Sequence, residues 1–175
     1  MERTGRRTRR AAALVLLAAI VGLYAGAPGP ARATEVESYQ LDGYEVFYSP
    51  TRAMFAGTSG DGLGGVSAWY SSIDHSLVIS PSGAITGGWA VLHRPDGVRI
   101  GGWFSGGDVV LVDDGPGCTT EAHSVEGALV SVTRSDTGAV GSGVFRATLL
   151  HHRAWLFGTC ISYSASVSGS IELTF

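Results

Sequence analysis

Apolar and polar residues alternate with a period of two along the last fifteen residues of the chain. The odd positions from Ile161 to Phe175 are apolar except Gly169, and the even positions are serine, glutamate or threonine. This period is typical of a β-strand with one face on a core. Because fifteen residues exceed a usual strand, Gly169 is predicted to mark a bend or bulge between two strand segments.

Ten shorter runs of similar character precede this segment, separated by clusters of Gly, Pro, Asp and Ser. They span residues 44–48, 53–58, 66–71, 76–80, 85–93, 98–105, 109–112, 128–133, 144–150 and 154–157. No stretch after Thr34 has sustained helical spacing, and 22 glycines in this part disfavour helices further. The chain is therefore predicted to be all-β, a single antiparallel β-barrel or β-sandwich built from short hairpins.

One hairpin is predicted in detail, around Arg94-Pro95-Asp96-Gly97-Val98. Pro fixes φ, Asp bonds the turn and Gly takes the left-handed position, which favours a three-residue turn with a bulge. In this register Trp89 opposes Trp103 and His93 opposes Arg99. Parity divides the hairpin into a core face of Ala90, Leu92, Val98, Ile100 and Phe104 and a second face of Trp89, Val91, His93, Arg99 and Trp103.

Residues 1–33 have the pattern of a secretory signal peptide. Four arginines between positions 6 and 10 precede an apolar run from Ala11 to Ala25, and Ala31-Arg32-Ala33 supplies the small residues of a cleavage site. A run of this length is too short to span a bilayer. We therefore expect cleavage before Thr34, a secreted extracellular domain of residues 34–175, and no transmembrane segment after signal removal.

The expected mature domain is acidic. Its six arginines face 14 carboxylates, and the chain has no lysine, so the net charge of this part is −8. So few cations cannot neutralise a row of phosphates, which argues against nucleic acid as a partner. The two cysteines of an exported chain are expected to pair, so Cys118 and Cys160 are the predicted disulfide.

The second face of the hairpin is the candidate ligand-binding site. Flat aromatic side chains such as Trp89 and Trp103 stack on sugar rings or aromatic ligands, while His93 and Arg99 supply directional hydrogen bonds. The alternative is that this hairpin is covered on both sides and that the two tryptophans simply pack in the interior.

The remaining chemistry-bearing residues predict no metal site, cofactor or catalytic residue. The spacing of the histidines is not that of a metal motif, and His151 and His152 are expected in an exposed turn before Arg153. No nucleophile or zinc-hydrolase motif is present. Carboxylate pairs for a hydrolase stay open, because such partners meet in space and not in sequence.

The terminal Phe175 after an amphipathic strand resembles the closing strand of bacterial outer-membrane barrels. That resemblance covers about ten residues, and the other runs lack a lipid-facing apolar band with aromatic girdles.

From the predicted signal peptide, the candidate aromatic face and the lack of catalytic motifs, we expect a secreted, non-catalytic binding module for an unidentified carbohydrate or small apolar molecule. The alternatives are a structural or protein-interaction protein of the cell surface, and a small secreted hydrolase.

Overall fold

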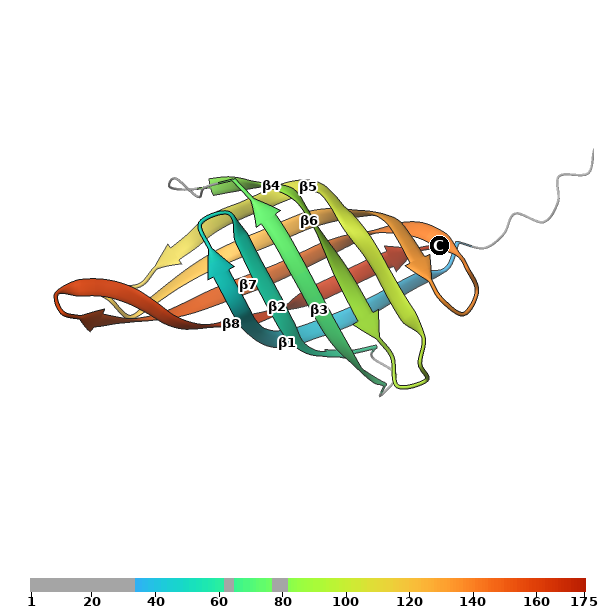
Figure 1. Ribbon diagram of the computed structural model, residues 1–175, viewed down its shortest axis with the longest axis horizontal. Coiled ribbons are helices and arrows are strands. Elements are labelled where there is room, and N and C mark those ends of the chain that lie inside the picture. Colours follow the sequence, from blue (N-terminus) through green and yellow to red (C-terminus); the bar gives the residue numbers. More distant parts are fainter. Residues whose placement is uncertain (1–33, 62–64, 77–81) are drawn as a thin grey trace, which may run out of the picture. The chain divides into compact units, whose positions relative to one another are not determined.

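The computed structural model describes residues 34–61, 65–76 and 82–175, which form a closed barrel of eight antiparallel strands (Figure 1). The predicted signal peptide and residues 77–80 of the expected strand 76–80 lie outside this part. Each strand pairs with the next, and the last pairs with the first. The strands are β1 (Val36–Ser49), β2 (Arg52–Gly60), β3 (Val66–His75), β4 (Ser82–His93), β5 (Arg99–Asp114), β6 (Thr120–Arg134), β7 (Val140–Leu156) and β8 (Thr159–Thr174). The all-β prediction is confirmed, and the fold is a barrel rather than a sandwich.

The strands are longer than the expected runs, at 9 to 17 residues. The runs 98–105 and 109–112, for example, belong to the single strand β5, which continues through Gly106 and Gly107. Its pairing with β6 shifts register between Phe104 and Gly106, as at a β-bulge. Gly106 and Gly107 thus lie at an irregularity within one strand instead of ending it. Among the described residues there is no helix long and apolar enough to span a membrane.

Aromatic side chains fill the interior of the barrel. Trp69 is fully buried, and its indole Nε1 donates a 3.0 Å hydrogen bond to the backbone carbonyl of Asp42. The rings of Phe55 and Phe145 lie 6.4 and 6.3 Å from the Trp69 ring, and Phe104 packs edge-on against Phe145. These contacts connect strands on different sides of the barrel. Packing of the aromatic side chains therefore stabilises the closed barrel in addition to the strand pairing.

Two glycines make room for these rings. A Cβ atom on Gly57 would lie 2.6 Å from Trp69 Nε1, and one on Gly127 would lie 2.7 Å from the Phe104 ring. Both distances are shorter than carbon contacts allow. The glycines therefore face the interior where the large aromatics need the space that a side chain would occupy.

The predicted parity of β8 is confirmed over its inner part and wrong at its start. The inward-facing residues there are Ala165, Val167, Ile171 and Leu173, all of them buried. Ile161 and Tyr163 are exposed, because this part of β8 extends beyond its pairing with β1. The bulge expected at Gly169 is absent, since its pairing with β1 and β7 is continuous; the irregularity lies at Tyr163 instead. Gly169 allows close approach to the backbone of β7, because a Cβ there would lie 2.1 Å from the Arg146 carbonyl oxygen.

The hairpin between β4 and β5 has the predicted turn and register. The Arg94 N–H donates to the Val98 carbonyl at 2.9 Å, and Gly97 has a φ of 85°. Trp89 pairs with Trp103 and His93 with Arg99, as expected. Four members of the predicted core face are buried, namely Ala90, Leu92, Ile100 and Phe104. The fifth, Val98, is partly buried.

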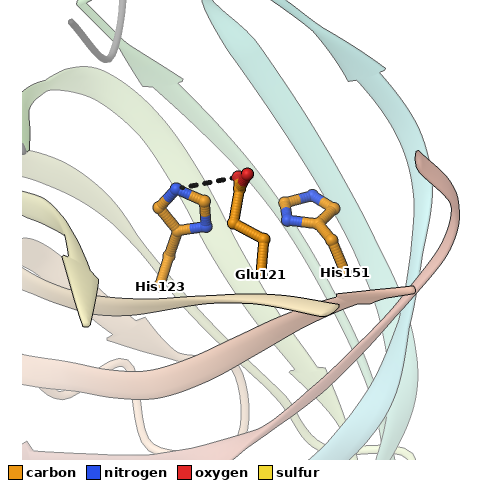
Figure 2. Close-up of side chains that lie close together, drawn as sticks. All are labelled: Glu121, His123 and His151. Carbon is orange, nitrogen blue, oxygen red and sulfur yellow. Dashed lines mark ion pairs between the residues drawn. The ribbon is translucent and has the colours of Figure 1, made fainter. Parts of the chain in front are cut away.

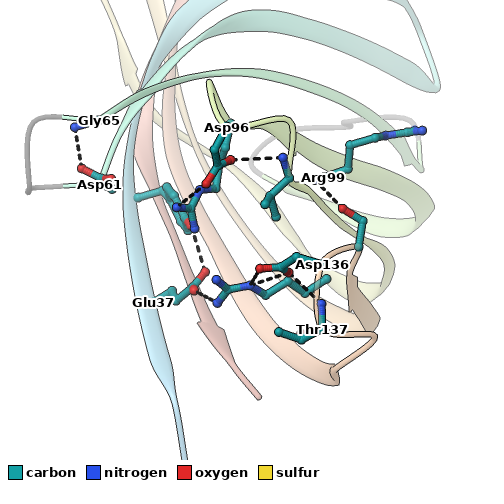
Figure 3. A network of polar contacts seen from close by, with 12 residues as sticks. Glu37, Asp61, Gly65, Asp96, Arg99, Asp136 and Thr137 are labelled. Carbon is teal, nitrogen blue, oxygen red and sulfur yellow. Dashed lines mark hydrogen bonds and ion pairs between the residues drawn. The ribbon is translucent and has the colours of Figure 1, made fainter.

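Charged groups cover the end of the barrel that holds the β4–β5 and β6–β7 turns (Figure 3). Arg134 forms ion pairs with Glu35, Glu37 and Asp136. The hydroxyl of the buried Tyr39 donates a 2.8 Å hydrogen bond to Glu37. This network ties the first strand to the turn after β6 and closes this end of the interior.

We predict that Ile171→Ser lowers the free energy of unfolding by about 3 kcal/mol, whereas Ser170→Thr changes it by less than about 0.5 kcal/mol. Ile171 is 2% exposed in the interior, and Ser170 lies on the outer face of the same strand. Urea unfolding of both variants measures the difference. Equal losses would show that both faces of β8 are buried.

A second prediction concerns alkaline pH. Burial, followed by the hydrogen bond to Glu37, raises the pKa of Tyr39 to about 12 from 10.0, although Arg94 acts in the opposite direction. The neutral phenol of Tyr39 contributes fully to the free energy of unfolding below pH 10, and this contribution is lost as the pH rises from 10 to 12. Between pH 10 and 12 the free energy of unfolding of the Tyr39→Phe variant should therefore fall less than that of the unchanged protein, by up to roughly 2 kcal/mol. Urea unfolding at both pH values measures it, with the exposed Tyr44→Phe as control; equal pH dependence in both variants would contradict the assignment.

Candidate functional site

The barrel interior opens at its other end into a cavity of about 450 Å³. Inward-facing apolar side chains form much of its wall: Phe55, Ile73, Val109, Leu111, Val125 and Leu149. Glu45, His75, Glu121, His123 and His151 add five titratable groups to this lining. A mostly apolar pocket with a few converging polar groups is the usual form of a small-molecule site.

The mouth of the cavity follows from incomplete pairing of β1 and β8. Their pairing ends at Tyr44 and Ser166, although both strands continue beyond these residues. The register of β1 against β2 also shifts between Glu45 and Phe47. Beyond this point β8 pairs only with β7, and their hairpin projects past the other hairpins (Figure 1). Residues from both separated strands line the cavity, among them Tyr48 and Tyr163.

A disulfide and an arginine hold the projecting hairpin. Cys118, in the turn between β5 and β6, is bonded to Cys160 near the tip, with a Cα–Cα distance of 5.7 Å, which confirms the predicted pair. Arg153 on β7 forms ion pairs with Asp114 and Glu121. The wall of the mouth is therefore fixed both covalently and electrostatically.

Two carboxylate–imidazole pairs meet in the cavity. Glu121 Oε1 lies 3.4 Å from His123 Nε2, and Glu45 Oε2 lies 3.4 Å from His151 Nε2. The two imidazole ring centres are 5.4 Å apart, and Figure 2 shows Glu121 between the rings. These side chains extend from β1, β6 and β7. Strands β6 and β7 are paired with each other, and β8 lies between β7 and β1 in the strand order.

Burial shifts the pKa of two groups in the cavity, His123 and Tyr48. Burial lowers the pKa of His123, and the nearby Glu121 acts in the opposite direction. Burial raises the pKa of Tyr48, and the nearby Glu45 and Glu121 raise the pKa of Tyr48 further. Three buried atoms of the two carboxylate–imidazole pairs have no hydrogen-bond partner among the described protein atoms: Glu45 Oε1, His123 Nδ1 and His151 Nδ1. An unpaired buried polar atom costs about 1–3 kcal/mol, so these atoms are available to a ligand at the mouth.

This cluster was not predicted from the sequence. His151 is 8% exposed on β7, so the expectation of an exposed turn at His151 and His152 is wrong. Because β7 continues to Leu156, alternation directs His151 inward and His152 outward. Glu121 is the direct cross-strand partner of His151, but the run expected to form β6 started only at residue 128. The cluster could have been predicted by continuing the alternation of β6 and β7 beyond their apolar segments, because Glu121, His123 and His151 then take inward positions.

The predicted tryptophan face lies on the outer wall, away from the cavity lining. Trp103 is 61% exposed, while Trp89 and His93 are half-buried and Arg99 is exposed. The register brings Trp89 beside Trp103 and His93 beside Arg99. Trp103 is therefore not packed in the interior, and the role of this face in binding stays a prediction.

No protein-family model, curated protein or solved structure matches the chain.

We predict that Trp103→Ala abolishes retention on an insoluble polysaccharide, such as cellulose or chitin, with little change in melting temperature. An exposed ring contributes little to folding but provides the surface for stacking. Affinity chromatography and thermal unfolding measure the two effects. Trp155→Ala, which removes an equally exposed ring from the hairpin tip, is the matched control. A large loss of stability, or equal retention of both variants, would contradict the binding role of this face.

Proposed function

We propose that this protein is a secreted, non-catalytic binding module whose barrel cavity takes a small, largely apolar molecule. The observation that carries the proposal is the cavity itself, with apolar walls and unpaired polar atoms at one site. Its volume of about 450 Å³ lies in the range of small-molecule pockets. Apolar surface that leaves water on binding supplies the affinity, and the polar atoms supply orientation.

The polar groups favour a ligand with a hydroxyl group. Glu45 Oε1 can only accept a hydrogen bond while the carboxylate is ionised, whereas an imidazole can donate or accept. A hydroxyl satisfies both kinds of partner. An anionic head group would instead meet the carboxylates of Glu45 and Glu121 at short range, which disfavours it.

A cell-surface interaction protein is an alternative, favoured by the projecting hairpin. Its tip carries Trp155, Leu156 and Phe157, and the last of these is 98% exposed. Large exposed apolar residues that lie together are typical of contact surfaces.

A small secreted hydrolase is the second alternative. The observation in its favour is that two carboxylates and two histidines converge in one cleft, which is the arrangement that acid–base catalysis requires. The same cavity would then turn its ligand over instead of retaining it.

Binding of 2-naphthol, an apolar fluorescent alcohol, tests the proposal. We expect saturable binding to the protein, weaker binding of the anionic 2-naphthoate, and a loss of at least about 10-fold in affinity on Ala165→Trp, which fills the cavity. Ser166→Trp places the same side chain on the outer face of β8 and is the matched control. Ala165→Phe serves in its place where the larger ring prevents folding, as judged by circular dichroism.

Absence of saturable naphthol binding, or equal binding to the Ala165 and Ser166 variants, would overturn the cavity proposal. Release of 2-naphthol from 2-naphthyl acetate, lost on Glu45→Gln, would instead establish the hydrolase.

A further inference from the structure

We propose that Glu121, His123 and His151 form a binding site for one divalent zinc ion at the mouth of the barrel. Each side chain offers one ligand atom, and these atoms all lie within 4.8 Å of one another. Within the described part of the chain this is the one group of three such side chains. The inference goes beyond the proposed function, because zinc binding requires no organic ligand.

The donor set selects the kind of metal. Two imidazoles and one carboxylate are a frequent ligand set of Zn²⁺, whereas Ca²⁺ and Mg²⁺ prefer six or more oxygen atoms. In tetrahedral zinc sites the ligand atoms lie about 3.4 Å apart, given metal–ligand distances near 2.1 Å. The three side chains therefore need to close by roughly 1.4 Å at most, which small side-chain rotations provide.

The buried nitrogen atoms support this assignment. His123 and His151 are 7% and 8% exposed, and Nδ1 of each ring has no hydrogen-bond partner among the described protein atoms. Without a metal ion, the carboxylates of Glu121 and Glu45 lie beside Nε2 of His123 and His151, and Nδ1 of each ring stays unpaired. A bound cation accounts for these nitrogen atoms and also reduces the repulsion between Glu45 and Glu121.

Neighbouring charged residues orient two of the three ligands, Glu121 and His151. Arg153 donates a 2.8 Å hydrogen bond to Oε2 of Glu121, which leaves Oε1 beside His123. Glu45 lies beside Nε2 of His151, the arrangement in which a second carboxylate holds a metal-binding imidazole. Three protein ligands leave a fourth position, and the cavity gives access to it.

Titration of Zn²⁺ into chelator-treated protein by isothermal calorimetry tests this site. We expect one ion per chain and a loss of affinity of about 100-fold or more on His123→Ala, because removal of a ligand should exceed the 10–100-fold effect of an outer-shell change. Bound Co²⁺ should show the visible absorption of a tetrahedral nitrogen–oxygen site, and Ca²⁺ should not compete.

His152→Ala is the matched control, since His152 is the next residue on β7 and faces outward. Its zinc affinity should equal that of the unchanged protein. Glu121→Gln, which keeps the size of the side chain, replaces His123→Ala where the latter does not fold. Absence of zinc binding, or equal affinity in the His123 and His152 variants, would overturn the site. Neither outcome affects naphthol binding by the unsubstituted protein, so the two proposals fail separately.

Discussion

The packing of Trp69 in the middle of the barrel is the contact on which the other features depend. Eight strands enclose a space that is just wide enough for side chains to fill. The Trp69 ring occupies this space from β3, contacts Phe55 and Phe145 on other strands, and satisfies its N–H on the Asp42 carbonyl. Because the middle is filled, the charged end and the open mouth are separate environments. A polar cluster can therefore form at the mouth without water passing through the barrel.

The two ends differ in how the strands finish. Arg134 connects the start of β1 with the turn after β6, so the closed end has opposite charges in contact. At the mouth, β1 and β8 lose their pairing after Tyr44 and Ser166, and no ladder of backbone hydrogen bonds joins them there. Separation of the strands creates the cavity, while the disulfide and Arg153 keep the free hairpin in place. The opening is thus a fixed part of the fold.

Local patterns predicted the parts of the structure that local physics determines. The turn at Arg94–Val98 depends on Pro and Gly dihedral preferences, and the inner part of β8 depends on alternation against one core. Both were readable because each needs only neighbouring residues. The cluster of Glu121, His123 and His151 was not readable, because its residues meet only when β6 and β7 pair. The prediction of a bulge at Gly169 was wrong for a related reason. Gly169 allows close approach to the backbone of β7, and this contact cannot be predicted from the sequence of β8 alone.

The polar cluster is best understood through its cost to folding. Replacement of a buried charged group by an apolar side chain of similar volume is often neutral or stabilising. Each unpaired atom of Glu45, His123 and His151 costs about 1–3 kcal/mol. The Cys118–Cys160 bond, which closes a loop of 42 residues, contributes about 4 kcal/mol, a stabilisation of the same order. The covalent bond lies beside the mouth, where strand pairing is incomplete and the unpaired groups gather. Because the disulfide restricts the unfolded chain, it stabilises the folded protein as a whole and offsets part of the free energy that the unpaired groups cost.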